Sequence, residues 1–219
     1  MKLKNRSTPL ILTALAPVLI PVFISAGLLA IASPALAHHP FGGTTPTSWV
    51  QGFLSGLGHP IIGPDHFVFT IIVGLLAIRS KPAVVVPMVF LGATLAGTGI
   101  HLMELNLPTP EFFISLSVVL FGVIAAYGRQ MSLTAIVILS AMAGIFHGYA
   151  YGEAVVGAEM TPLLAYLAGF TLIQAAIMAV AFGIAQKLLG PVKRLAWLRY
   201  AGFMACGAGG AFLSSLLLG

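Results

Sequence analysis

The stretch HPIIGPDHFVFTIIVGLLA, residues 59–77, decides the fold class of this chain. Its first part combines two prolines and a glycine, which interrupt helices, with two histidines and an aspartate. Its second part is an apolar run, and long apolar runs recur along the rest of the sequence. These runs lack the alternation of a transmembrane barrel strand, so helices are the spanning structure that satisfies every backbone polar group in lipid. We therefore predict an all-α, polytopic membrane protein.

Composition supports this fold class. The 219 residues are 59% hydrophobic and only 7% charged, whereas soluble domains carry about 25% charged residues. The basic residues are scattered at segment ends rather than gathered in one patch, which argues against a nucleic-acid partner and for a lipid bilayer. A single cysteine, Cys206, excludes an internal disulfide and a multi-thiolate metal site.

The N-terminal 37 residues have the pattern of a secretory signal peptide. A basic start precedes an apolar run over residues 9–31, and Ala35-Leu36-Ala37 then forms a small-residue cleavage site. Cleavage there would leave His38 as the first residue of the mature protein, while the alternative is an uncleaved anchor helix. Residues 38–219 are predicted to form a single transmembrane domain.

Proline, glycine and charged residues divide this domain into helices. We predict helices over residues 49–58, 64–79, 82–104, 111–128, 131–151, 161–187 and 196–218. The first two are too short for ordinary spans, because a crossing takes about 20 residues. Breaks at Gly58-His59-Pro60 and Gly63-Pro64 separate them, so together they are predicted to form one broken, partly re-entrant span. About six transmembrane helices result.

Charge predicts the orientation of these helices. Arg79, Lys81, Arg129 and the basic residues of 187–199 fall on alternate connections, which the positive-inside rule assigns to the cytoplasm. Both mature ends then lie outside. Helical proteins of a bacterial envelope belong to the inner membrane, because outer-membrane proteins are barrels. The sequence contains no Walker motif, and it leaves the oligomeric state and any energising partner open.

Ionisable residues inside membrane spans mark functional sites by default, because their burial is costly. The strongest cluster is His59, Asp65 and His66, which surround the helix break, and Asp65 at a helix start also suits the positive end of the helix dipole. A histidine alone in a helix is as readily a hydrogen-bonded core residue. Three titratable groups together are better explained by a bound cation.

Two further pairs are candidate ligands. His101 and Glu104 are three residues apart and are expected to share one helix face. His147 precedes Glu153 by six residues, so Glu153 joins the same site only if the helix breaks near Gly152. The predicted orientation places all these side chains, with those of the helix break, in the outer half of the membrane. They could converge on one outward-facing cavity.

The ligand types favour a first-row transition metal. Imidazole with carboxylate suits nickel, cobalt, zinc or copper, whereas the scarcity of carboxylates argues against calcium and magnesium. After cleavage of the signal, His38 and His39 could form a chelate of square-planar tendency through the free α-amine, the deprotonated amide and the imidazole that follows, which points to nickel(II) or copper(II).

Two other functions use the same residues. An intramembrane zinc-dependent metalloenzyme could hold its metal with the histidines and Asp65, with Glu104 or Glu153 as its base, although no HExxH motif occurs. A proton-coupled carrier could relay protons through the same side chains without binding metal.

The segment HPIIGPDH followed by FVFTIIVGLLA resembles the HupE/UreJ family of nickel and cobalt permeases, which carry a His-Pro-x-x-Gly-x-Asp-His pattern in their first mature span. His147-Gly148 is similar to the second histidine motif of the family. The resemblance implies that the protein is a permease without a prosthetic group, not an enzyme, and that nickel or cobalt is its transported ion. It also implies that the cluster of His59, Asp65 and His66, together with His147, matters for uptake, and makes Glu104 and Glu153 candidates.

From the residues and the resemblance together, we predict secondary or facilitated uptake of nickel or cobalt. The His38/His39 arm would capture the ion and pass it to the cluster at the helix break, and His101, Glu104 and His147 would complete the cavity.

Overall fold

The computed structural model describes residues 44–127, 131–188 and 190–218, and this part of the chain contains helices and no strand. The helices are α2 (Trp49–Ile62), α3 (Pro64–Leu76), the 3-10 helix η2 (Ala77–Arg79), α4 (Val85–Leu102), α5 (Pro110–Tyr127), α6 (Leu133–Glu153), α7 (Met160–Leu188) and α8 (Pro191–Leu218). The predicted all-α class is confirmed. The predicted signal peptide and the His38/His39 arm lie outside the described residues.

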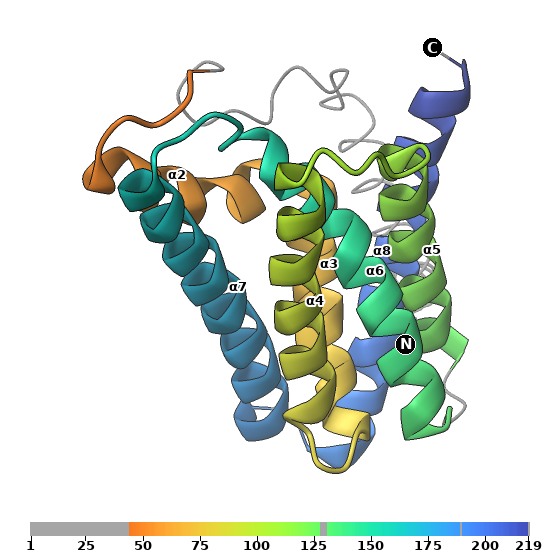
Figure 1. Cartoon of the computed structure of the whole chain (residues 1–219). Helices are drawn as coiled ribbons and strands as arrows, with labels where there is room; N and C mark the ends of the chain where they lie inside the picture. The colour runs from red at the N-terminus through yellow and green to blue at the C-terminus, as the bar shows by residue number, and fades with distance from the viewer. Residues whose placement is uncertain (1–43, 128–130, 189, 219) are drawn as a thin grey trace, which may run out of the picture.

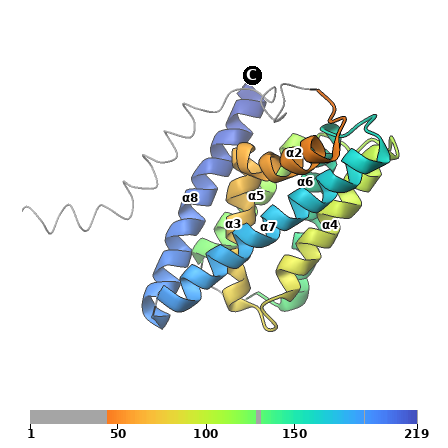
Figure 2. The same ribbon diagram turned by 90° about the vertical axis from the view of Figure 1, so that its left-hand side faces the viewer.

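Within the described ranges, five helices, α4 to α8, are long and apolar enough to cross a membrane. Helices α2 and α3 qualify as a sixth span only when taken together, and the chain bends by 80° between them. With 14 residues, α2 is about 21 Å long, which is shorter than a bilayer core of about 30 Å. It lies across the ends of the other helices (Figures 1 and 2). This arrangement confirms the broken first span.

The break itself is narrower than the sequence predicts. We expected interruptions at Gly58-His59-Pro60 and at Gly63, but α2 continues through Pro60 and ends only at Gly63. Proline costs a helix one backbone hydrogen bond, and extensive packing of α2 against α7 offsets that cost. Pro64 then takes the first position of α3, where no backbone donor is needed. Pro191 begins α8 in the same way, five residues before the predicted start.

Close helix pairs build the bundle. The most extensive contacts join α4 with α6, α5 with α8, and α2 with α7. Gly148 of α6 lies directly against the backbone of Thr94 in α4, where a side chain would not fit. The hydroxyl of Thr98 donates a hydrogen bond of 2.8 Å to the carbonyl of Gly148. Small residues thus allow close backbone approach, as they do in membrane helix pairs generally.

The two ends of the bundle differ in chemistry. At one end, here called the histidine end, α2 crosses the bundle, α4 and α6 finish, and α7 begins (Figure 1). At the opposite end, the basic end, lie Arg79, Lys81, Lys187 and Arg194. The guanidinium of Arg194 donates hydrogen bonds to the carbonyls of Ala185 and Gln186 and so caps the end of α7. Between the ends, buried residues of α3, α4, α5 and α6 form an apolar core.

Candidate metal-binding site

Three fully buried histidines meet near the histidine end. His59 of α2, His66 of α3 and His147 of α6 are only 1%, 2% and 0% exposed. The ring centres of His59 and His66 are 5.9 Å apart, and those of His66 and His147 are 4.9 Å apart. The bend at Gly63 makes this possible, because it lets α2 lie over the start of α3. We call these three residues the histidine cluster.

Hydrogen bonds determine which nitrogen of His66 carries its proton. Ser117 donates its hydroxyl proton to the carbonyl of Ile114 at 2.7 Å, so the same oxygen must accept from Nε2 of His147 at 3.0 Å. A neutral imidazole has one N–H, and a buried imidazolium would be costly. Nδ1 of His147 is therefore an acceptor. Nδ1 of His66, 2.8 Å away, must be the donor.

A second chain of hydrogen bonds, from His59 through Tyr166 to Tyr151, fixes the proton of His59 in the same way. The hydroxyl of Tyr166 donates to the carbonyl of Tyr151 at 2.8 Å, and this carbonyl lies in the last turn of α6, where helix carbonyls lack helical partners. Tyr166 has no second proton to give. Its oxygen must accept from Nδ1 of His59, which is 2.8 Å away.

Both chains of hydrogen bonds give His59 and His66 the same tautomer. With Nδ1 protonated, His59 and His66 each carry the ring lone pair on Nε2. Metal-ligating histidines typically donate their other ring N–H to a carboxylate, a backbone carbonyl or water, which fixes the ring and raises the basicity of the ligating nitrogen. Here a phenol oxygen and an imidazole nitrogen take the place of these acceptors. The histidine cluster therefore has the local structure of two neutral imidazole ligands.

Tyr151 packs against both His59 and His66. Its ring centre is 5.0 Å from that of His59 and 4.6 Å from that of His66. The side chain is wholly buried, and its hydroxyl has no hydrogen-bond partner in the described part of the chain. A buried hydroxyl without a partner is costly, so this oxygen is suited to contact a bound ion or its water.

Asp65 stands next to the cluster in the first turn of α3. It is half-buried, and its Oδ1 accepts a hydrogen bond of 2.8 Å from the backbone N–H of His66. The carboxylate thus satisfies one of the free donors of the helix start. It also places a negative charge beside the buried imidazoles.

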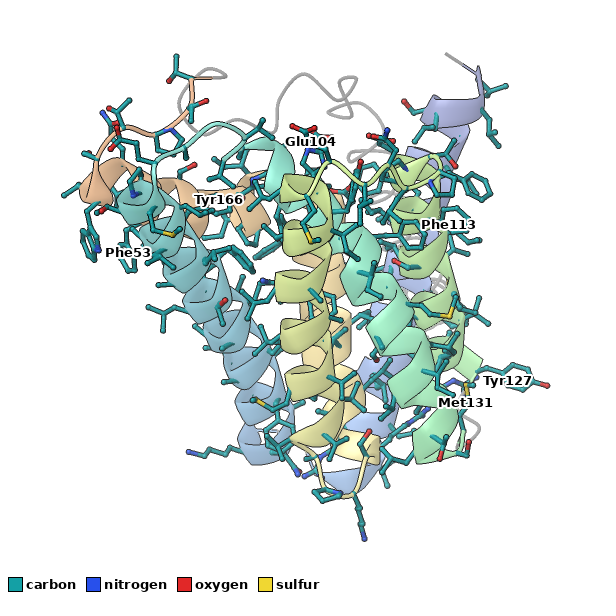
Figure 3. The ribbon with its side chains drawn as sticks, viewed as in Figure 1. Phe53, Glu104, Phe113, Tyr127, Met131 and Tyr166 are labelled. Atoms are coloured by element: carbon teal, nitrogen blue, oxygen red, sulfur yellow. The ribbon has the colours of Figure 1, made fainter. Side chains whose placement is uncertain are left out.

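The other predicted ligands lie further out. His101 is half-buried, its ring centre is 4.3 Å from that of Tyr149, and its Nδ1 lacks a partner among the described residues. Glu104 and Glu153 are exposed, and we call these two residues the carboxylate rim. Figure 3 shows Glu104 at the same end of the bundle as Tyr166.

The predicted shared helix face of His101 and Glu104 is wrong. Helix α4 ends at Leu102, and Glu104 has φ 59°, a left-handed conformation. The N–H of Leu105 donates to the carbonyl of Ile100, and the N–H of Glu104 donates to that of His101. These two bonds form a Schellman motif, in which the position of Glu104 is usually glycine. A glutamate there is less favourable for the backbone, which makes its side chain a functional candidate.

The predicted ligands are thus brought together only in part. Three histidines and Asp65 are neighbours, whereas Glu104 and Glu153 remain at the surface. Helix α6 continues through Gly152 to Glu153, so the break that would bring Glu153 to the face of His147 is not present. In the described ranges, no three His, Cys, Asp or Glu side chains form a ready metal-binding group.

Three residues of the site were not predicted from the sequence. Tyr151 follows His147 by four residues, so helical periodicity could have placed it on the same face. Ser117 and Tyr166 lie in apolar runs, and their separations from their histidine partners are 30 and 107 positions. No local pattern in the sequence connects these partners.

Comparison with known proteins points to the same family as the segment HPIIGPDH, residues 59–66. The chain is 29% identical over 193 residues to Protein HupE of Rhizobium leguminosarum bv. viciae, which covers 87% of this chain and 96% of that protein. No solved structure matches. The sequence profile of the family described as HupE / UreJ protein matches residues 26–212. The chain therefore belongs to the HupE / UreJ family.

Proposed function

We propose that this protein is an inner-membrane permease for nickel or cobalt, and that His59 and His66 bind the ion through Nε2. The observation that carries the proposal is the pair of buried imidazoles whose Nδ1 protons are engaged by Tyr166 and His147. Imidazole is a suitable ligand for both ions. The proposal gives no preference between them, because both accept the same ligands.

Charge and oxygen atoms complete the proposed site. Asp65 beside His66 would offset the repulsion that a divalent cation meets in a low-dielectric environment. The unpartnered hydroxyl of Tyr151 would contact the ion or a water that it retains. Glu104 and Glu153 would raise the local concentration of cations at the histidine end by their charge, and the His38/His39 arm would capture the ion by ligation.

The hydrogen-bond chains favour this function over a proton relay. One chain ends at the carbonyl of Ile114 and the other at the carbonyl of Tyr151. A backbone carbonyl accepts a hydrogen bond but cannot pass a proton on. The chains therefore suit the orientation of ligands better than the conduction of protons. A hydrolytic enzyme would need a base beside its metal, and Glu104 and Glu153 are at the exposed rim.

The test is accumulation of radioactive nickel and cobalt in cells that express the protein, beside His59→Asn and His66→Ala at equal membrane abundance. Asparagine places an amide donor near the position of Nδ1 but supplies nothing at Nε2, so His59→Asn can retain the bond to Tyr166 while losing the ligand.

We expect the parent protein to accumulate one or both metals and both variants to lose at least about tenfold, the size of effect seen when a metal site is disturbed. Parental uptake by His59→Asn would refute ligation through Nε2. Absence of uptake of either metal by the parent protein would refute the permease function.

A further inference from the structure

A wholly buried amide lies in the middle of α7, the longest of the helices that the structure describes. Gln174 of α7 is 0% exposed, and its Nε2 donates a hydrogen bond of 3.2 Å to the carbonyl of Phe170. Its Oε1 is buried and has no partner among the described residues. An amide oxygen without a partner in an apolar bundle costs free energy, so a position of this kind requires a reason.

Helix register places this amide one turn beyond the histidine cluster. A Cβ built on Gly74 of α3 would lie 2.7 Å from the Cα of Met178 in α7. These two residues are therefore level, which here means at the same height between the two ends of the bundle. Both helices run from the histidine end toward the basic end (Figure 1). Counting back four residues on each, Thr70 and Gln174 are level, one turn from His66 toward the basic end.

Ring contacts agree with this register. Tyr151 packs against His66 at 4.6 Å and against Phe170 at 5.3 Å, measured between ring centres. Phe170 is four residues before Gln174, as His66 is four residues before Thr70. The buried face of α7 therefore runs from the histidine cluster directly to the amide.

Oxygen atoms at this level can receive a cation. Thr70 is also 0% exposed, and it donates its hydroxyl proton to the carbonyl of His66 at 2.8 Å, which leaves lone pairs on its oxygen. Neutral oxygen ligands bind nickel and cobalt less tightly than imidazole does. A weaker site beyond a tighter one lets an ion move on, because passage requires binding that is favourable enough to enter and weak enough to leave.

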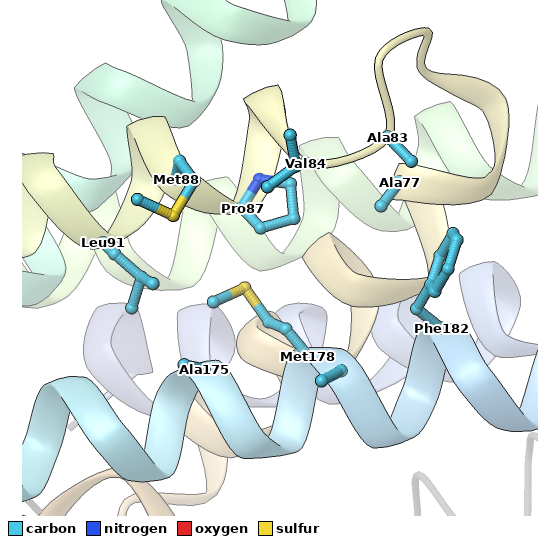
Figure 4. Close-up of a pocket in the computed structure, with 10 residues that line it drawn as sticks. Ala77, Ala83, Val84, Pro87, Met88, Leu91, Ala175, Met178 and Phe182 are labelled. Carbon is cyan, nitrogen blue, oxygen red and sulfur yellow. The ribbon is translucent and has the colours of Figure 1, made fainter.

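A cavity begins on the far side of this level. It has a volume of about 350 Å³ and lies between α4 and α7 (Figure 4). Ala175 and Met178 line it from α7, and Pro87 and Met88 line it from α4. Met88, which also lines it, is 58% exposed, so the cavity opens on the side of the bundle between α4 and α7. Met178, one turn after Gln174, is the next buried residue of α7 and lines this cavity.

We propose that Gln174 and Thr70 form a second, weaker cation site through which the transported ion leaves the histidine cluster toward the basic end. This inference rests on the proposed function and adds to it the path beyond the imidazoles. The ion would exchange an imidazole nitrogen for Oε1 of Gln174 and the Thr70 oxygen before Met178 moves aside.

The experiment separates binding from passage. Gln174→Met keeps the length of the side chain and removes the amide, and Thr70→Val keeps the shape and removes the hydroxyl. The matched control is Ser140→Ala in α6, which removes another wholly buried oxygen that lacks a partner among the described residues. Radioactive nickel is measured in two ways, as binding to each purified protein by equilibrium dialysis and as accumulation in cells at equal membrane abundance.

We expect Gln174→Met to bind nickel within twofold of the parent protein and to accumulate it about tenfold more slowly, a loss of the size of one hydrogen bond to a charged group. Thr70→Val should lose severalfold in accumulation, and the control should retain parental values. Parental accumulation by Gln174→Met overturns the inference, and so does a loss of binding equal to its loss of accumulation.

If Gln174→Met fails to reach the membrane, Thr70→Val decides by the same two measurements. Failure of the parent protein to bind nickel is a different result, because it would refute the proposed function itself.

Discussion

The histidine cluster and the carboxylate rim lie at the same end of the bundle but are built in opposite ways. The three imidazoles are almost wholly inaccessible, pack against aromatic rings, and have their protons assigned by hydrogen bonds. Glu104 and Glu153 are exposed. Exposed charges act at a distance and are screened by salt, whereas ligands act only in contact and in one protonation state. If the proposed function holds, we expect position to matter in the cluster and charge to matter at the rim.

The largest effect among our predictions concerns Tyr166. Replacement by phenylalanine removes the acceptor of the His59 Nδ1 proton and keeps the packed ring. His59 can then rotate or place its proton on Nε2, so nickel affinity should fall by about 10- to 100-fold, the usual cost of losing such a partner. Equilibrium dialysis of the purified variant measures this change.

A double variant sharpens this prediction. If Tyr166 acts only through His59, then adding Tyr166→Phe to His59→Asn should cause little further loss of nickel affinity. The effects of substitutions at two residues of one hydrogen-bond network are not additive. Independent, multiplied losses would contradict a positioning role for Tyr166.

A smaller loss is expected for Ser117→Ala. The variant leaves Nε2–H of His147 without its acceptor, which favours the other tautomer of His147. His66 would then have to accept at Nδ1 and carry its proton on Nε2, so its lone pair would no longer face an ion. Because the effect passes through one more ring, we expect about a tenfold loss of affinity, at the lower end of the range for such partners. A two-state shift in the nitrogen-15 resonances of His66 would establish the tautomer change, and unaltered resonances would contradict it.

The smallest effect is expected at the rim. Glu104→Gly removes the carboxylate and gives the left-handed position the residue that favours it, so the variant should be more stable by about 0.5–1 kcal/mol. Uptake should fall only about two- to fivefold at low ionic strength and be unchanged at high ionic strength, because the charge acts at a distance. Glu104→Gln, which keeps the backbone strain, should give the same uptake without the gain in stability. A loss as large as that of Tyr166→Phe would place Glu104 among the contacting ligands.

The sequence predicted the fold class well because the signals are local. Apolar runs of sufficient length can only be helices in lipid, and the glycine-proline pair at 63–64 marks the bend. Helix ends were less predictable. Pro60 remains inside α2 because tertiary packing against α7 offsets the lost hydrogen bond, and Glu104 turns out of α4 because a Schellman motif ends that helix. The signal peptide and the orientation stay predictions.

For the candidate site, the sequence by itself was enough to single out the side chains that we propose as ligands. His59, Asp65, His66 and His147 stand out because ionisable residues are rare in apolar spans. Only the tertiary structure decided how they are arranged. It brought Tyr166 to His59 and Ser117 to His147 across separate helices, and it placed Gln174 level with Thr70. The physical reason is that a proton position or a helix register depends on partners distant in the chain, which local periodicity does not encode.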